Sequence, residues 1–204
     1  MFDARLRPII NPPLNAAGRW LSARGVSANA VTFAGLLLAF GAAAAVVQHA
    51  WAAALALIVL NRICDGLDGA VARANEPSDF GGYIDSVADF AFYTAIPLAF
   101  ALAHPANAFA AALLLAAFTL TGVSFLAFAA IAAKRGLETQ RHGRKSFFYS
   151  TGIAEGAETI AVFVLMCLFP DNFAVITYCY AAICIMTVVQ RSFLAWHIFI
   201  RTTP

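Results

Sequence analysis

Apolar stretches, each about as long as a bilayer is thick, dominate this sequence. A transmembrane helix needs roughly 20 predominantly apolar residues, and six such stretches fit into the chain, at approximately 29–49, 51–74, 82–103, 107–133, 147–169 and 173–198. Hydrophobic residues make up 62% of the 204 positions and charged residues only 12%, whereas soluble domains carry about 25% charged residues. The sequence therefore predicts an all-α integral membrane protein, a six-transmembrane-helix bundle.

The connections between these stretches are too short to hold a second domain, so we expect 1–204 to be one membrane domain with its core over 28–200. Residues 1–27 interleave four arginines with Leu, Ile and Trp side chains. This pattern is typical of a juxtamembrane amphipathic helix that lies at the bilayer surface. An untethered basic tail is the alternative. Charges and prolines before residue 25 argue against a signal peptide.

Basic residues outside the apolar stretches indicate the orientation. They precede the first stretch, follow the sixth and fill 134–145 between the fourth and the fifth. The connections on the other side, at 48–50, 104–107 and 170–172, contain no Lys or Arg. Because cytoplasmic loops are enriched in these residues, both termini and 134–145 are predicted to face the cytoplasm.

Four aspartates interrupt the second and third apolar stretches within 25 residues. Asp65 and Asp68 are three residues apart and Asp85 and Asp89 are four apart, so each pair shares one face of its helix. The segment 74–80 contains Asn, Pro and Ser and reads as a tight turn, which lets the two pairs face each other near the cytoplasmic interface. An ionised carboxylate away from water costs several kcal/mol unless it is compensated. The cluster therefore predicts a bound cation or a hydrated functional cavity.

Oxygen ligands at this density suit a hard divalent cation, with Mg²⁺ the first candidate and Mn²⁺ or Ca²⁺ behind it. Four carboxylates could hold two ions and clamp a diphosphate. Arg73, just over two helical turns beyond Asp65, could neutralise phosphate charge. Gly66, Gly69 and Ala72 lack bulk, which would let a phosphorylated ligand approach the backbone. A Gly/Ala face taken alone is more often a site of helix packing.

These residues form a long motif that resembles the signature of the CDP-alcohol phosphotransferases, membrane enzymes of phospholipid synthesis. The family pattern is Asp, two residues, Asp-Gly, two residues, Ala-Arg, about eight residues, Gly, three residues, Asp, three residues, Asp. The chain matches this pattern from Asp65 to Asp89, with a gap of seven residues if Gly81 is the matched glycine. Gly82 would restore the gap of eight but leaves two residues before Asp85. We take Gly81, because one helical turn then separates it from Asp85.

The resemblance implies a metal-dependent transferase. It would move a phosphatidyl group from a CDP-linked lipid such as CDP-diacylglycerol to an alcohol and release CMP, with two Mg²⁺ (or Mn²⁺) ions as cofactors. By this resemblance Asp65, Asp68, Asp85 and Asp89 are the metal ligands. Asp89 would also be the general base that takes the proton of the acceptor hydroxyl. The CDP and its phosphates would be bound by Asn29, Thr32, Asp65, Gly69, Ala72, Arg73 and Gly81. For Asn29, the competing interpretation is an N-cap of the first transmembrane helix.

The whole-chain pattern, including 145–147 and 155–159, is most similar to a bacterial inner-membrane branch of unassigned acceptor. The resemblance implies a multi-pass protein of the inner (cytoplasmic) membrane with its active site on the cytoplasmic side. It also implies a homodimer. The expected partners are the CDP-lipid, the alcohol acceptor and membrane lipid, with no nucleic acid.

Charged residues outside the motif are the candidates for binding the acceptor alcohol: Arg144, Lys145, Glu155, Glu158 and Arg191. The two glutamates are expected roughly 15 Å inside the cytoplasmic end of the fifth helix, where acids are functional candidates. Their structural alternative is an ion pair with Arg62 or Arg191. For Arg191, snorkelling toward lipid headgroups is the alternative, and for the basic residues of 134–145 it is orientation and contact with anionic lipid. Glycerol phosphate, serine, inositol and inositol phosphate all remain open as acceptors.

A cation transporter that uses the intramembrane carboxylates as a relay is the competing hypothesis. A transporter would be expected to distribute its acids along a path and to break helices near the bilayer midplane. In this sequence the acids cluster near one interface, beside an arginine and small residues. The pattern therefore favours the enzyme.

Overall fold

The computed structural model describes residues 3–136 and 152–201, and the regular elements in these ranges are all helical. The long helices are α1 (Asp3–Ala23), α2 (Ala28–Val47), α3 (Trp51–Ala74), α4 (Asp79–Ala103), α5 (Ala108–Lys134), α6 (Gly156–Leu168) and α7 (Phe173–Arg201). Two short 3₁₀ turns, η1 (Pro105–Asn107) and η3 (Pro170–Asn172), precede α5 and α7. The all-α prediction is confirmed, and α3 has the bounds that its apolar stretch predicts.

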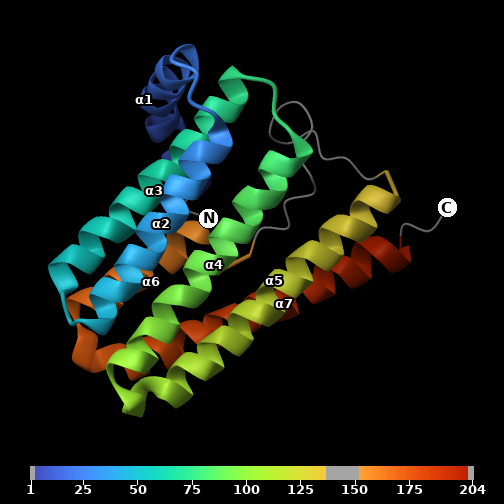
Figure 1. Cartoon of the computed structure of the whole chain (residues 1–204). Coiled ribbons are helices and arrows are strands. Elements are labelled where there is room, and N and C mark those ends of the chain that lie inside the picture. The colour runs from blue at the N-terminus through green and yellow to red at the C-terminus, as the bar shows by residue number, and fades with distance from the viewer. Residues whose placement is uncertain (1–2, 137–151, 202–204) are drawn as a thin grey trace.

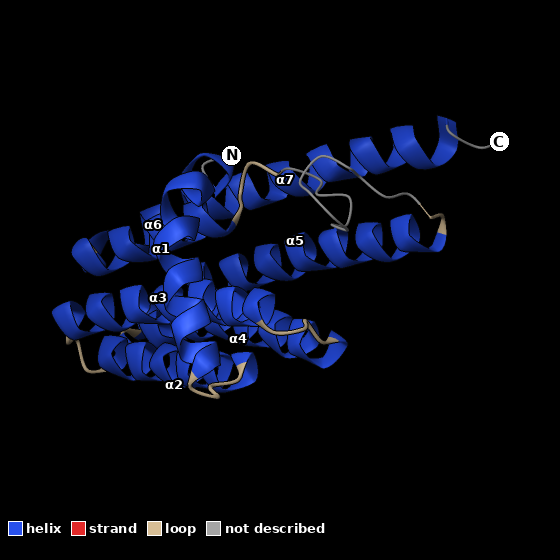
Figure 2. Cartoon of the chain, turned by 90° about the horizontal axis from the view of Figure 1, so that it is seen from above, coloured by secondary structure: helices blue, strands red, loops and turns tan. Residues whose placement is uncertain are grey.

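The helices pack in two groups that meet at α4 and α6 (Figure 1). In one group α3 packs against α1 and α2, and α2 also packs against α4. In the other, α5 runs beside α7, which is visible from above as well (Figure 2). Contacts of α4 with α5 and of α3 with α6 join the groups. The two helices that carry the acidic motif, α3 and α4, thus make the contacts between the groups.

Aromatic side chains fill the core where the groups meet. Phe92 and Phe100 of α4, Phe163 of α6 and Phe173 of α7 are fully buried. The ring of Phe100 stacks on that of Phe173 at 4.5 Å, and Phe92 meets Phe163 edge to face at 5.4 Å. These pairs tie the helix that ends the acidic motif to both C-terminal helices.

Four helical segments in the described residues are long and apolar enough to cross a membrane: Ala28–Val47, Asp79–Ala103, Pro105–Lys134 and Pro170–Ile200. Their outward faces carry exposed apolar side chains such as Leu37, Phe109 and Phe193, which a bilayer would cover. α3 has sufficient length at 24 residues, but it contains the first half of the charged motif. The protein therefore has several helices that can span a membrane, and the count of six stays a prediction.

The fifth apolar stretch differs from its prediction. α6 begins at Gly156 and has 13 residues, which rise about 20 Å, less than the roughly 30 Å of a bilayer's hydrocarbon core. Glu155 is the N-cap of α6 and Glu158 lies in its first turn, so the prediction that both lie deep inside a fifth helix is wrong. The Glu155 carboxylate accepts a hydrogen bond from the Gly152 N–H at 3.0 Å, and residues 152–154 are not helical.

The N-terminal segment forms α1, as its amphipathic pattern predicts, and packs on α3 instead of forming an untethered tail. A Cβ atom added at Gly18 would lie 2.7 Å from the Cβ of Ala70, and one added at Gly66 would lie 2.8 Å from a methyl carbon of Leu14. Gly66 therefore faces Leu14 of α1, where α1 packs on α3. The prediction that Gly66 leaves room for a ligand is wrong.

Candidate active site

The four aspartates of the motif converge on one small cavity of about 10 Å³ between α2, α3 and α4. The antiparallel course of α3 and α4 brings them together. Ser78 caps α4 by accepting a hydrogen bond from the Gly81 N–H at 3.0 Å. This short capped turn lets Asp65 and Asp68 from α3 and Asp85 and Asp89 from α4 line the same space.

Asp68 is the most deeply buried of the four, at 5% exposure, and it receives a hydrogen bond from a second helix. The hydroxyl of Thr32 on α2 donates to Asp68 Oδ2 at 2.7 Å. One turn beyond Thr32 on α2, the Gly35 carbonyl accepts a hydrogen bond from the side-chain amide of Asn61 on α3 at 2.8 Å. These contacts fix α2 against α3 beside the carboxylates.

Arg62 lies among the carboxylates. Its Nη1 is 3.0 Å from Asp89 Oδ1, to which it donates a hydrogen bond, and 3.7 Å from Asp65 Oδ2. The alternative that pairs Arg62 with Glu155 or Glu158 is therefore wrong. Sequence reasoning did not include Arg62 in the site, although its position three residues before Asp65 puts both on one helix face.

The carboxylate cluster has the donor chemistry that Mg²⁺ or Mn²⁺ requires, since all four side chains offer oxygen ligands to one cavity. Within the part of the chain that the structure describes, however, no three acidic, His or Cys side chains already converge at metal-ligand distances. Asp89 is instead held by the Arg62 guanidinium. The residues fit a divalent cation, provided that the carboxylates close in around it.

A larger cavity of about 370 Å³ opens beside this cluster. Five of the residues predicted to bind CDP line it, together with Asp68 and Asp85: Asn29, Thr32, Gly69, Ala72 and Gly81. A Cβ atom at Gly81 would lie 3.3 Å from Asn29 Oδ1 and 3.0 Å from Ser78 Oγ, whereas one at Gly82 would meet nothing within 4 Å. The need for a small residue is therefore at Gly81.

Two other predicted residues are placed differently. The N-cap of α2 is Ser27, whose side chain accepts from the Ala30 N–H at 3.2 Å, so the N-cap interpretation of Asn29 is wrong. Arg73 is not among the residues that line the larger cavity. It donates through Nε and Nη2 to Asn15 Oδ1 of α1, at 3.3 and 3.0 Å. Asn15 is 58 residues away, and no spacing rule in the sequence indicates this contact.

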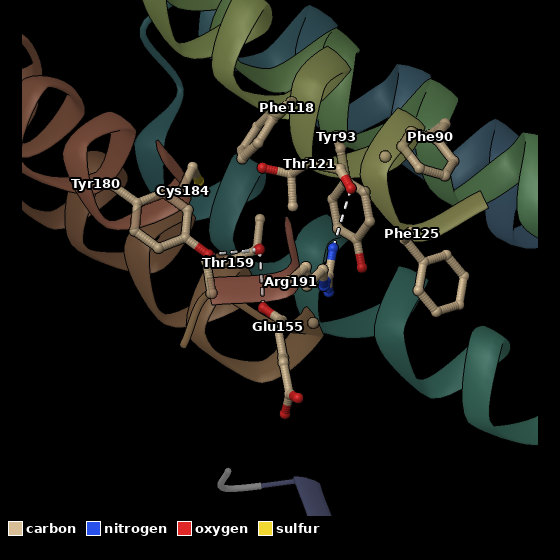
Figure 3. A pocket seen from close by; sticks show the side chains of 13 residues that line it. Phe90, Tyr93, Phe118, Thr121, Phe125, Glu155, Thr159, Tyr180, Cys184 and Arg191 are labelled. Carbon is tan, nitrogen blue, oxygen red and sulfur yellow. Dashed lines mark hydrogen bonds between the residues drawn. The ribbon is translucent and has the colours of Figure 1, made fainter. Parts of the chain in front are cut away.

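A third cavity of about 190 Å³ lies between α4, α5, α7 and the start of α6 (Figure 3). Five aromatic residues from three helices contribute to its lining: Phe90, Tyr93, Phe118, Phe125 and Tyr180. The hydroxyls of Thr159 and Tyr180 form a hydrogen bond of 2.7 Å within it, and Glu155 and Arg191 are also in the lining. Sequence reasoning missed the aromatic lining because its members are scattered over about 90 residues and share no spacing.

Arg191 is only 7% exposed and faces α5. Its Nη1 donates to the backbone carbonyl of Thr121 at 3.0 Å and lies 3.5 Å from Ser124 Oγ. The snorkelling alternative for Arg191 is therefore wrong. Glu158 is outside the lining of the aromatic cavity, and Arg144 and Lys145 lie outside the described residues.

Comparisons with known proteins agree with the motif and the fold. The model of the CDP-alcohol phosphatidyltransferase family matches residues 26–200. The inner membrane protein YnjF of Escherichia coli K12 is 44% identical over 192 residues, which cover 94% of this chain and 93% of YnjF. The chain belongs to the CDP-alcohol phosphatidyltransferase family, and the resemblance drawn from the motif is confirmed. It is accordingly a membrane transferase of phospholipid biosynthesis.

Two further comparisons, one of sequence and one of structure, are with synthases of inositol phosphate lipids by name. Archaetidylinositol phosphate synthase of Pyrococcus horikoshii is 32% identical over 87 residues, 42% of this chain and 46% of that protein. The fold is similar to that of two crystal structures of phosphatidylinositol phosphate synthase from Mycobacterium tuberculosis. One has CDP-DAG bound (TM-score 0.72, 19% identity, 90% of this chain and 93% of that chain). The other is in complex with manganese and citrate (TM-score 0.70, 20% identity, 90% and 88%). At these identities the likeness establishes the fold.

Proposed function

We propose that this protein transfers a phosphatidyl group from a CDP-linked lipid, such as CDP-diacylglycerol, to an alcohol and releases CMP. The observation that carries the proposal is the convergence of all four motif aspartates on one cavity beside a larger one. The membership in the family supports it. So does the CDP-DAG bound to a protein of the same fold. The same membership favours a transferase over a cation transporter.

In this proposal the 370 Å³ cavity takes the cytidine diphosphate. The nucleotide would be surrounded by Asn29, Thr32, Gly69, Ala72 and Gly81. The small side chains among them would leave room for it in the cavity. Asp65 and Arg73 would help to bind the phosphates. Since Arg73 is bonded to Asn15, we expect its guanidinium to leave α1 when phosphate enters.

We propose that two Mg²⁺ or Mn²⁺ ions would be held by Asp65, Asp68, Asp85 and Asp89. The manganese in a protein of the same fold supports a divalent metal of this type. When bound, the ions would offset charge on the diphosphate and on the leaving oxygen. Asp89 would also take the proton from the acceptor hydroxyl, because a neutral alcohol is a weak nucleophile. General-base assistance of this type contributes on the order of 10²–10⁴-fold to the rate.

The aromatic cavity is our candidate for the acceptor site. Phe90 and Tyr93, which line it, follow Asp89 by one and four residues on α4, so it lies next to the proposed base. Glu155 and Arg191 supply charged groups in its lining. Arg144, Lys145 and Glu158 remain candidates for the same role. The acceptor remains open among the alcohols named above.

We further propose that the protein lies in a bacterial inner membrane, as the name of YnjF supports. Both termini and the active site would face the cytoplasm, and the protein would be a homodimer.

The test is release of CMP by the purified protein in detergent, with CDP-diacylglycerol and a panel of alcohols. We expect release only when Mg²⁺ or Mn²⁺ and a suitable alcohol are both present, and chelation with EDTA should abolish it. Lipid products identified by mass spectrometry would name the alcohol. Folded protein that releases no CMP across a broad panel, or that conducts cations without nucleotide in proteoliposomes, would contradict the proposal.

Replacement of the proposed base is a sharper test. Asp89→Asn keeps the size of the side chain and removes its ability to take a proton, so CMP release should fall at least about 10²-fold, while binding of the CDP-lipid is retained. Asp79→Asn is the matched control, because Asp79 lies in the first turn of the same helix and lines none of the three cavities. Equal activity of the two variants would remove the base assignment.

A further inference from the structure

Arg62 stands outside the family motif, yet its guanidinium lies in the middle of the carboxylate cluster. It approaches both an aspartate of α3 and one of α4, with Nη1 at 3.7 Å from Asp65 and 3.0 Å from Asp89. These are two of the four proposed metal ligands. The side chain is 18% exposed, so solvent screens these contacts only in part.

Neighbouring groups hold Arg62 in this position. Its Nε donates to Asn61 Oδ1 at 2.8 Å, and Asn61 in turn donates to the Gly35 carbonyl of α2. The guanidinium carbon lies 4.4 Å from the ring centroid of Phe92, a residue that is itself fully buried. Stacking on an aromatic face and a hydrogen bond at Nε direct the remaining nitrogens toward the aspartates.

The charges explain why a cation is needed there. Four carboxylates line a cavity of about 10 Å³, and among the residues in that lining Arg62 is the basic one. A divalent ion held by Asp65 and Asp89 would draw on the same two carboxylate groups that face the guanidinium. The ion and Arg62 therefore compete for these carboxylates.

We propose that Arg62 is a resident counter-cation of the carboxylate cluster, which stabilises the metal-free protein and lowers its affinity for divalent cations by competing for Asp65 and Asp89. This inference rests on the metal site of the proposed function. It adds a residue outside the motif that sets how much Mg²⁺ or Mn²⁺ the enzyme needs.

The experiment measures Mn²⁺ binding to the purified full-length protein in detergent, without nucleotide, from the electron paramagnetic resonance signal of free Mn²⁺. Arg62→Met keeps an unbranched apolar stem beside Phe92 and removes the charge. We expect its dissociation constant for Mn²⁺ to fall about tenfold, as loss of one charged hydrogen bond to a ligand implies. Arg24→Met is the control. It removes one positive charge from a residue that stacks on Trp20 and lines none of the three cavities, and should change the constant less than twofold.

A second measurement separates competition from a general loss of structure. In EDTA, Arg62→Met should unfold at a lower temperature than the wild type, and saturating Mn²⁺ should remove most of this difference. Arg62→Lys, which keeps the charge, should retain a dissociation constant closer to the wild-type value and serves as the test if the Met variant does not fold.

An unchanged or weaker Mn²⁺ affinity in Arg62→Met, with Mn²⁺ bound by the wild type, would overturn the role of Arg62 and leave the proposed function intact. If the Met variant does not fold, Arg62→Lys is compared with the uncharged variant Arg62→Gln. Equal dissociation constants of these two variants for Mn²⁺ would likewise overturn the role of Arg62. Wild-type protein that binds no Mn²⁺ would overturn this inference and the metal site together.

Discussion

The hydrogen bond from Thr32 to Asp68 offers the most direct test of how the site is held before ligands arrive. Thr32 and Asp68 are 6% and 5% exposed, and the hydroxyl oxygen lies 2.7 Å from Asp68 Oδ2. The Ala28 carbonyl, at 3.1 Å, is the other acceptor within reach of this hydroxyl. An ionised carboxylate is the stronger and nearer acceptor of the two. Thr32→Val removes the donor while it preserves the shape of the side chain.

The expected cost follows from the burial of both partners. A hydrogen bond to a charged group contributes about 1.5–3 kcal/mol, and both partners of this one are buried. For a chain of this length, a loss of about 2 kcal/mol lowers the melting temperature by roughly 4–8 °C. Because partners of metal ligands orient those ligands, we also expect Mn²⁺ affinity to fall about 10- to 100-fold.

The assay is thermal unfolding of the purified protein in detergent with EDTA, followed by Mn²⁺ titration. Thr177→Val is a matched control, because the Thr177 hydroxyl is also buried and has no hydrogen-bond partner among the residues that the structure describes. This control should leave the melting temperature unchanged or raise it slightly. If Thr32→Val melts within about 1 °C of the Thr177→Val variant, the reasoning is refuted.

Two further predictions concern helix contacts around the site. Gly122→Val should raise the KM for the alcohol severalfold and leave the KM for CDP-diacylglycerol unchanged. A Cβ atom at this position would lie 2.5 Å from Cε1 of Phe90, which lines the aromatic cavity. Unchanged alcohol kinetics would argue against an acceptor site in that cavity. Gly18→Val should destabilise the protein by about 1–3 kcal/mol through overpacking of α1 on α3, measured as a lower melting temperature. Gly41→Ala, whose nearest contact would be an ordinary 3.6 Å, is its control, and equal melting temperatures would contradict the prediction.

The sequence predicted the helices of the N-terminal half closely, because their apolar runs are long and end at turn-forming residues. It failed at the start of α6, where a polar contact decides the boundary. The predicted stretch begins at 147, whereas α6 begins at Gly156. Just before α6, the Glu155 carboxylate accepts a hydrogen bond from the Gly152 N–H and the Thr187 hydroxyl accepts one from the Ala154 N–H. The second contact comes from α7, 33 residues away, and no local pattern can indicate it.

The sequence alone predicted which residues would carry the chemistry. The spacing of Asp65, Asp68, Asp85 and Asp89 is a local property of two helices and a short turn, so the motif and the family follow from it directly. Tertiary structure decided what surrounds these residues: Arg62 among the aspartates, Thr32 on Asp68, Arg73 on α1, and aromatic rings from three helices around the neighbouring cavity. Such contacts depend on how separate helices are packed against one another. That packing results from the sum of many weak side-chain interactions, which the order of residues along any one helix does not record.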